Sequence, residues 1–174
     1  TETISISREP EHGTLSGISL SDESDVDLAK WIGTYTPDGN YAGSDEIRFT
    51  VTNPNNPNSG GLSDEAIILI AVNPVNDAPT INAIADQSFD EDNSLDLTLE
   101  YTDPDSDLSV DVSSSNADNI SVSLDGSNLT VSPSLNYNGE SIISVTVSEI
   151  GGEYQATESF SVTINAVNDT PTIS

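Results

Sequence analysis

One segment of the chain occurs twice, and this internal repeat limits the possible folds more than any other feature of the sequence. Residues 35–43 read Tyr-Thr-Pro-Asp-Gly-Asn-Tyr-Ala-Gly, and residues 131–139 read Val-Ser-Pro-Ser-Leu-Asn-Tyr-Asn-Gly, so that Pro, Asn, Tyr and Gly recur in register. A second pair, Val-Asn-Asp-Ala-Pro at 75–79 and Val-Asn-Asp-Thr-Pro at 167–171, recurs at a similar spacing. Because self-similarity at a fixed period is typical of tandem structural units, we expect two copies of about 95 residues.

Apolar and polar residues alternate through the second copy, which is the pattern of half-buried β-strands. The alternation predicts seven short strands, at residues 81–84, 95–99, 110–112, 120–124, 129–131, 143–147 and 160–164. Asp125 and Gly126, between two of these strands, favour a tight hairpin turn. Seven short alternating strands are typical of an antiparallel sandwich, so the fold class that we expect is all-β, with two sandwiches in tandem.

The first copy shows five comparable strands, near Ile4, near Leu15, and at residues 32–35, 47–51 and 68–72. Measured back from its Val-Asn-Asp-Ala-Pro segment, this copy begins too late to contain the first two strands of a complete sandwich. A sandwich without these strands has an exposed core or an unpaired edge. We therefore assign residues 1–76 to a sandwich that lacks its first strands, residues 77–169 to a complete seven-stranded sandwich, and residues 170–174 to the start of a linker to a next repeat.

The charge of the chain excludes several classes of partner. The chain contains 30 Asp and Glu residues but only three Lys and Arg residues, which gives a formal net charge of -27. Such a polyanion is repelled by nucleic-acid phosphates and by anionic lipid surfaces. No run approaches the roughly 18 apolar residues of a membrane helix, and the absence of Cys excludes disulfides and thiolate metal sites. Cations are the natural partners of a chain with this composition.

The order of the strands assigns the acidic loops to the two ends of each sandwich, because connections in an antiparallel sandwich alternate between its ends. Three segments then converge on the junction between the copies, and their candidate ligands are Asp45, Glu46, Asn76, Asp77, Asp103, Asp105 and Asp107. A terminal half-site at the far end of the second copy has the candidate ligands Glu91, Asp92, Glu140, Asn168 and Asp169. Since Ca2+ takes six to eight oxygen ligands from carboxylates, amide carbonyls and water, the cofactor that we expect is Ca2+.

The acids have three other interpretations: solvated loop residues, an EF-hand and a catalytic pair. For any single acid, a solvated loop residue is an equally good interpretation, and only the convergence of the whole set favours a metal site. An EF-hand is excluded because Leu108 stands where its loop needs Gly and Ser114 stands where it needs Glu. Catalysis is not expected, because the single His12 has no nucleophile pattern near it and the carboxylates follow loop ends and not a cleft.

Taken together, these motifs resemble the cadherin-like tandem repeats of large bacterial surface adhesins. The resemblance rests on the Val-Asn-Asp-Ala-Pro linker, the Glu-Asp pair at 91–92, the Asp-Pro-Asp-Ser-Asp segment at 103–107 and the repeated Pro-x-x-Asn-Tyr-x-Gly motif. It implies a rod of Ig-like sandwiches that is stiffened by Ca2+, exported to the cell surface, and used in attachment or biofilm formation. The partners that it implies are the neighbouring repeats of the same chain and a cell-surface or polysaccharide receptor, with the segment itself monomeric.

The resemblance also assigns ligands residue by residue. The Asn-Asp pair of the cadherin linker maps onto residues 76–77 and 168–169, its Asp-x-Asp motif onto Asp103 and Asp105, and its early Glu onto Glu91. The leading Asp of the linker is replaced by Pro or Ala in the two copies. We therefore expect one or two ions at the junction and not the three of a full cadherin junction.

A carbohydrate-binding sandwich module is the alternative function. Such modules bind sugars through exposed aromatic faces, and Trp31, Tyr35 and Tyr41 form the one local aromatic cluster of the sequence. We favour a packing role for these residues, because Tyr41 recurs as Tyr137 at the equivalent position of the second copy.

Overall fold

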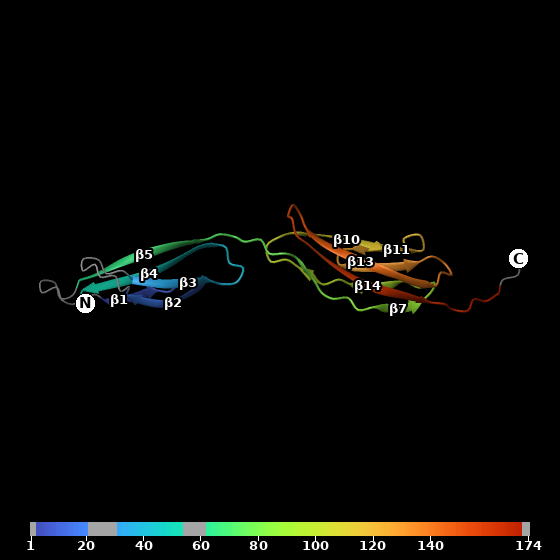
Figure 1. Ribbon diagram of the computed structural model, residues 1–174, viewed down its shortest axis with the longest axis horizontal. Helices are drawn as coiled ribbons and strands as arrows, with labels where there is room; N and C mark the ends of the chain where they lie inside the picture. Colours follow the sequence, from blue (N-terminus) through green and yellow to red (C-terminus); the bar gives the residue numbers. More distant parts are fainter. Residues whose placement is uncertain (1–2, 21–30, 54–61, 172–174) are drawn as a thin grey trace. The chain divides into compact units, whose positions relative to one another are not determined.

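The computed structural model describes residues 3–20, 31–53 and 62–171 (Figure 1). Every regular element in this part of the chain is a β-strand, which confirms the all-β fold class. The chain divides into two compact units, Thr1–Val75 and Asn76–Ser174. Each unit is described by itself below.

The second unit is a sandwich of two main sheets. Its strands are β6 (Thr80–Ile81), β7 (Gln87–Asp90), β8 (Leu95–Thr98), β9 (Tyr101–Thr102), β10 (Leu108–Ser114), β11 (Ile120–Asp125), β12 (Asn128–Pro133), β13 (Gly139–Glu149) and β14 (Gln155–Asn165). One sheet has the order β10-β13-β14-β7 and the other the order β11-β12-β8, while β6 and β9 form a separate pair. The core lies between the two sheets and includes Leu129, Val131, Val145 and Val162, all with 0% exposure.

The alternation of apolar and polar residues in the sequence matches the burial of the strands in the structure. Along β13, Ile143, Val145 and Val147 are fully buried, and they are separated by partly exposed Ser144 and Thr146. The structure adds two strands that the sequence pattern did not predict, the two-residue β9 and the strand β7, which contains a single large apolar residue. Strand β7 pairs parallel with β14, while every other strand pair is antiparallel among the described residues.

The repeated Tyr-x-Gly motif has a structural explanation. The backbone of Gly139 has φ 154°, and a Cβ atom at this position would lie 2.6 Å from the hydroxyl oxygen of Tyr137. Gly43 has φ 147° and stands in the same relation to Tyr41, whose hydroxyl donates a hydrogen bond to the carbonyl of Ser44 at 2.7 Å. In both units the ring therefore folds over the glycine where the long central strand begins.

The first unit contains the five strands that the sequence predicts. They are β1 (Thr3–Arg8), β2 (Gly13–Leu20), β3 (Trp31–Pro37), β4 (Gly43–Asn53) and β5 (Leu62–Val72). The sheet β1-β4-β5 repeats the order β10-β13-β14, and the pair β2-β3 repeats β11-β12. Within the described residues, the first unit has no strand in the positions that β7 and β8 occupy in the second.

Candidate functional site

Five polar residues gather at the start of the second unit, and we call them the entry cluster: Asn76, Asp77, Asp103, Asp105 and Glu149. They come from three segments that the fold brings together. Residues 76–77 open the unit, residues 103–105 lie in the loop between β9 and β10, and Glu149 is the last residue of β13. Four of the five are residues that the sequence predicts for the junction site.

The loop after β9 is organised by the carboxylate of Asp103. Its Oδ1 atom accepts hydrogen bonds from the backbone N–H groups of Asp105, at 3.0 Å, and Ser106, at 2.8 Å. Its Oδ2 atom is buried and has no hydrogen-bond partner among the described residues. One oxygen of this carboxylate is therefore fixed by the turn, and the other is buried without a hydrogen bond in the part of the chain that the structure describes.

The carboxyl groups of Asp103 and Asp105 influence each other. The pKa of Asp103 lies below its ordinary value, chiefly because its carboxylate accepts a hydrogen bond from the backbone N–H of Asp105. The pKa of Asp105 is raised, chiefly because its carboxyl group is hydrogen-bonded to the Asp103 carboxylate and also because it is partly desolvated. A cation near the two carboxyl groups would favour the ionised form of both.

Side-chain hydrogen bonds connect the rest of the entry cluster. The Nδ2 group of Asn76 donates to Oε1 of Glu149 at 2.8 Å, and the hydroxyl of Ser106 donates to Oδ1 of Asn76 at 3.4 Å. The backbone N–H of Asp77 donates to Oδ2 of Asp105 at 3.2 Å. The first two residues of the unit are thus held against both the β9–β10 loop and the end of β13.

Glu149 is the member of the entry cluster that the sequence analysis missed. Its side chain is 6% exposed, and it lies in phase with the buried residues Val145 and Val147 of β13. The signal was therefore present in the alternation, as an acid at a position that should be apolar. A Cβ atom on Gly152 would collide with the Glu149 carboxylate, so a glycine in the following turn gives this side chain its room.

The role of Asp107 as a ligand stays a prediction. Its side chain is exposed, and its backbone carbonyl accepts a hydrogen bond from the N–H of Ile150 at 2.8 Å. Within the described residues, no group of three or more Asp, Glu or His side chains is close enough to hold a metal ion by itself. An ion at the entry cluster would therefore need amide, backbone or water oxygens in addition to the carboxylates.

The predicted junction ligands of the first unit, Asp45 and Glu46, lie in strand β4 and not in a loop. Asp45 is 6% exposed, and its carboxylate accepts hydrogen bonds from the N–H groups of Glu11, His12 and Glu46 and from the hydroxyl of Tyr35. Burial by itself raises the pKa of Asp45, but these hydrogen bonds outweigh it and lower the pKa to about 2. The Asp45 carboxylate is thus engaged inside its own unit.

Glu46 is paired with cations of the first unit. Its Oε1 atom accepts hydrogen bonds from the guanidinium groups of Arg48, at 2.9 Å, and Arg8. The hydrogen bond from Arg48 is the main reason why the pKa of Glu46 lies below its ordinary value. Participation of Asp45 and Glu46 in a site shared with the second unit stays a prediction.

At the far end of the second unit, Glu91 is the one predicted ligand that is buried, with 5% exposure. Its Oε1 atom accepts a hydrogen bond from the backbone N–H of Val167 at 2.7 Å, and its own N–H donates to the carbonyl of Asn165. Glu91 therefore contacts the segment that follows β14, as the position of the predicted half-site requires.

The other predicted members of the terminal half-site are exposed. The Oδ1 atom of Asp92 accepts a hydrogen bond from the N–H of Asn136 at 2.9 Å, which fixes a loop. Glu140 lies in β13, and the side-chain amide of Asn168 donates to the carbonyl of Asp169 at 3.3 Å. In the described part of the chain no hydrogen bond joins these side chains to Glu91, and the half-site stays a prediction.

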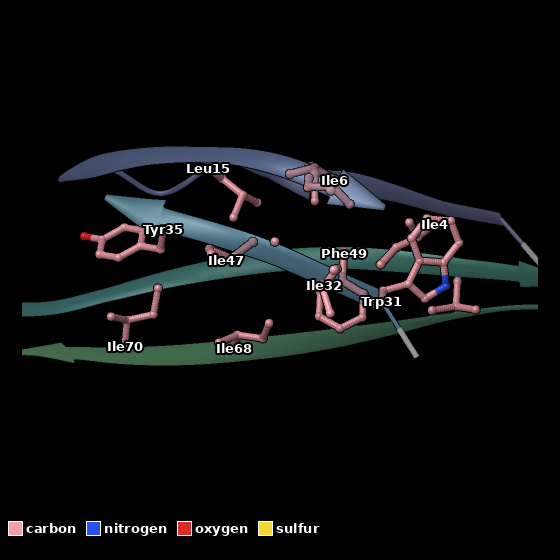
Figure 2. Close-up of a pocket in the computed structure, with 13 residues that line it drawn as sticks. Ile4, Ile6, Leu15, Trp31, Ile32, Tyr35, Ile47, Phe49, Ile68 and Ile70 are labelled. Atoms are coloured by element: carbon pink, nitrogen blue, oxygen red, sulfur yellow. The ribbon is translucent and has the colours of Figure 1, made fainter. Parts of the chain in front are cut away.

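Two of the three aromatic residues of the alternative carbohydrate site lie against the apolar interior of the first unit. Trp31 and Tyr35 line an apolar hollow between the two sheets of the first unit (Figure 2). The ring of Tyr41 stacks on that of His12, with centroids 4.2 Å apart. This arrangement agrees with the packing role of Trp31 and Tyr35.

Comparison with known proteins identifies the family of the second unit. The sequence model of the bacterial Ig domain matches residues 76–165, which is more than half of the chain. Domains of this family occur in surface proteins and are typically non-catalytic. No curated protein matches the chain. Among the described residues, no helix is long and apolar enough to cross a membrane.

Solved structures with a similar fold include cadherins. Cadherin domains 3–6 of protocadherin gamma B2 share 16% identity with the chain at a TM-score of 0.56, over 94% of this chain and 41% of that one. Drosophila N-cadherin EC1-4 shares 15% identity at a TM-score of 0.46, over 94% and 42%. An endo-fucoidan hydrolase shares 19% identity at a TM-score of 0.40, over 96% and 24%. The chain thus spans less than half the length of these three structures, and the first of them supports the cadherin-like fold.

Proposed function

Because the chain belongs to the family of bacterial Ig domains, we propose that it is a structural and adhesive repeat segment of an extracellular surface protein and that its entry cluster binds Ca2+. The segment is not an enzyme in this proposal. Its partners are the neighbouring repeats of the same polypeptide and a receptor on a cell or polysaccharide surface.

The observation that carries the calcium proposal is the buried Oδ2 atom of Asp103, which no described residue hydrogen-bonds. A charged oxygen held away from water costs free energy unless it is hydrogen-bonded or coordinates a cation. The other oxygen of the same carboxylate is held by two backbone N–H groups, so its orientation is already fixed. A cation bound to the Oδ2 atom of Asp103 would supply the missing interaction.

The chemistry of the entry cluster favours Ca2+ among the possible cations. Asp103, Asp105 and Glu149 supply carboxylate oxygens and Asn76 an amide oxygen, while sulfur ligands are absent from the chain because it contains no Cys or Met. Hard oxygen donors of mixed type, completed by water, are the ligands of Ca2+. Bound there, the ion would offset the mutual repulsion of the Asp103 and Asp105 carboxylates.

The distribution of charge supports an external cation. The three basic residues of the chain are Arg8, Lys30 and Arg48, so residues 49–174 contain no Lys or Arg. The acids of the second unit therefore have no cationic side chain in their own unit to offset them. A bound divalent ion would neutralise the negative charge of those acids that are partly desolvated.

The proposed role of the ion is mechanical. The entry cluster includes residues 76–77, which directly follow the boundary between the units, and an ion there would tie them more firmly to the β9–β10 loop. We expect the connection to bend less when the ion is bound. Because extracellular Ca2+ modules bind with Kd values of about 10⁻⁴ to 10⁻³ M, millimolar external Ca2+ would fill such a site.

Thermal unfolding tests the proposal. We expect the Tm of the second unit to rise on titration of Ca2+ into EDTA-treated protein, with a gain of about 2.7 kcal/mol at a hundredfold excess over Kd. Asp103→Asn should remove the shift, while Asp111→Asn, an equal change of charge at an exposed position of β10, should preserve it. Equal shifts for both variants would place the binding elsewhere, and no shift for the wild-type chain would contradict calcium binding.

A further inference from the structure

Strand β5 of the first unit is apolar on both of its faces. Its inward residues Ile68 and Ile70 line the hollow between the sheets (Figure 2). Because successive side chains of a strand point to opposite faces, Ile67, Leu69 and Ala71 lie on the outward face. Leu69 is 79% exposed and Ile67 is 49% exposed. The sheet β1-β4-β5 therefore presents a row of apolar side chains to its surroundings.

The second unit shows the ordinary pattern at the same positions. Strands β4 and β5 pair in the same register as β13 and β14, with Gly43 opposite Val72 in one unit and Gly139 opposite Ile164 in the other. The outward positions of β14 are equivalent to Ile67, Leu69 and Ala71, and they are Ser159, Ser161 and Thr163. Polar residues are usual on the outward face of an antiparallel sheet. The apolar row is thus a feature of the first unit alone.

The core of the first unit does not account for this row. A contact made inside the hollow involves the inward side chains of β5, and it leaves Ile67 and Leu69 uncovered. Adjoining exposed apolar side chains with polar neighbours are typical of a contact surface. The outward row therefore calls for a partner outside the sandwich.

Charges of both signs lie beside the apolar row. In the pairing of β4 with β5, Arg48 lies opposite Ile67, and Glu46 lies opposite Leu69. The carboxylate of Glu46 accepts hydrogen bonds from the guanidinium groups of Arg48 and of Arg8 in β1. These two arginines are the Lys and Arg residues of the described part of the chain. Positive charge is thus concentrated around one face of an otherwise acidic molecule.

We propose that the outward face of β5 is a contact surface for a second copy of this chain. Two chains with a net charge of -27 repel each other over most of their surface. The face around Ile67 and Leu69 is the exception, because guanidinium groups there offset the acids. A basic partner would be attracted more strongly to the acidic loops of the second unit. An apolar row with balanced charges beside it therefore favours a partner with the same properties.

The order of the residues along β4 and β5 makes this face self-complementary. In a twofold contact, a residue i of one copy meets a residue j of the other, and the reverse contact is made as well. A twofold axis at the level of Ile68, perpendicular to the strands, places Ile67 of one copy opposite Leu69 of the other. It also places Arg48 opposite Glu46, since these residues are the β4 partners of the same two apolar residues. Apolar side chains and opposite charges are thus matched in one arrangement.

The contact is small, because a single strand supplies its apolar centre. Interfaces well below the standard size of about 1,600 Å2 belong to weak or transient complexes. We therefore expect a dimer that is populated only at high protein concentration. This association departs from the monomeric state that the resemblance implies, and it does not depend on the calcium proposal, because the entry cluster takes no part in it.

Sedimentation equilibrium of the 174-residue chain over a range of concentrations tests the proposal. We expect a monomer–dimer equilibrium whose Kd rises about tenfold or more in Leu69→Ser. Leu135→Ser is the matched control, because Leu135 lies in the second unit and is 81% exposed against 79% for Leu69. The control should leave the Kd unchanged. Circular dichroism of both variants checks that they are folded.

Disulfide crosslinking tests the arrangement, because the chain contains no Cys of its own. A mixture of Ile67→Cys and Leu69→Cys chains should form mixed disulfide dimers on mild oxidation, and more of them than either variant forms with itself. A mixture of Leu135→Cys and Leu69→Cys chains should form few.

Four results would overturn the proposal. A wild-type chain that stays monomeric up to about 1 mM would exclude the second copy as the partner. Equal changes of the Kd in Leu69→Ser and Leu135→Ser would place the contact elsewhere, and equal crosslinking of Leu69→Cys with Ile67→Cys and with Leu135→Cys would exclude the twofold arrangement. A monomeric chain in which Leu69→Ser lowers the Tm of the first unit would assign the apolar row to a contact within the same chain.

Discussion

The side-chain amide of Asn76 donates a hydrogen bond of 2.8 Å to the buried carboxylate of Glu149. This bond ties the first residue of the second unit to the last residue of β13, its long central strand. The start of the unit is therefore tied to a strand whose inward side chains form part of the core.

Replacement of Glu149 should destabilise the second unit even without calcium. Glu149→Ala leaves the amide of Asn76 without its acceptor, and hydrogen bonds to charged groups contribute about 1.5–3 kcal/mol. We expect a loss of this size in the free energy of unfolding measured by urea denaturation in EDTA. Glu140→Ala, at an exposed position of the same strand, should cost much less. Equal losses for the two variants would contradict the structural role of Glu149.

The Tyr-x-Gly turn should tolerate no side chain at its glycine. Gly139→Ala adds a Cβ atom that meets the Tyr137 hydroxyl at 2.6 Å, and it does so at a positive φ. We expect a loss of about 2 kcal/mol or more in the free energy of unfolding. Gly126→Ala is the matched control, because Gly126 also has a positive φ but no atom lies within 4 Å of the added Cβ. A Gly139→Ala variant as stable as the Gly126→Ala variant would refute the steric explanation.

Acid should destabilise the first unit through Asp45. The pKa of Asp45 in the folded protein is about 2, whereas an Asp in an unfolded chain titrates near 3.9. Because the folded value is the lower one, the stability that the ionised carboxylate contributes is present above about pH 4 and is lost as the pH falls through about 2. Urea denaturation followed by Trp31 fluorescence should show this loss.

Asp45→Asn should flatten the pH dependence of the first unit over this range. Asp38→Asn, in the exposed turn after β3, removes the same charge without removing the hydrogen bonds of Asp45 and should leave the slope unchanged. A wild-type slope that persists in the Asp45→Asn variant would show that another group controls the acid response.

The sequence predicted those strands in which apolar and polar residues alternate locally. Strand β13 is an example, because its burial alternates over its full length. Strand β7 was missed because it has a single large apolar residue, Phe89, and it exists through its parallel pairing with β14, which is distant in the sequence. Pairing of this kind depends on the tertiary fold and leaves little local signal.

The sequence predicted only part of the candidate site, because the missed residues also depend on the tertiary fold. Counting acids in loops found Asp103 and Asp105, whose positions follow from the order of the strands. It missed Glu149, which is buried at the end of a strand, and it placed Asp45 in a loop although long-range hydrogen bonds from Glu11 and His12 hold it in β4. Carboxylates that the fold engages for its own stability cannot be separated from free ligands by position in the sequence alone.

Titration calorimetry with Ca2+ on EDTA-treated protein tests the central claim most directly. We predict saturable binding with a Kd in the range of about 10⁻⁴ to 10⁻³ M for the wild-type chain and for Asp111→Asn. The Asp103→Asn variant should lose most of this binding, because the substitution converts the carboxylate with the unpartnered oxygen into an uncharged amide. Wild-type binding retained in Asp103→Asn, or the absence of binding in the wild-type chain, would contradict a calcium site at the entry cluster.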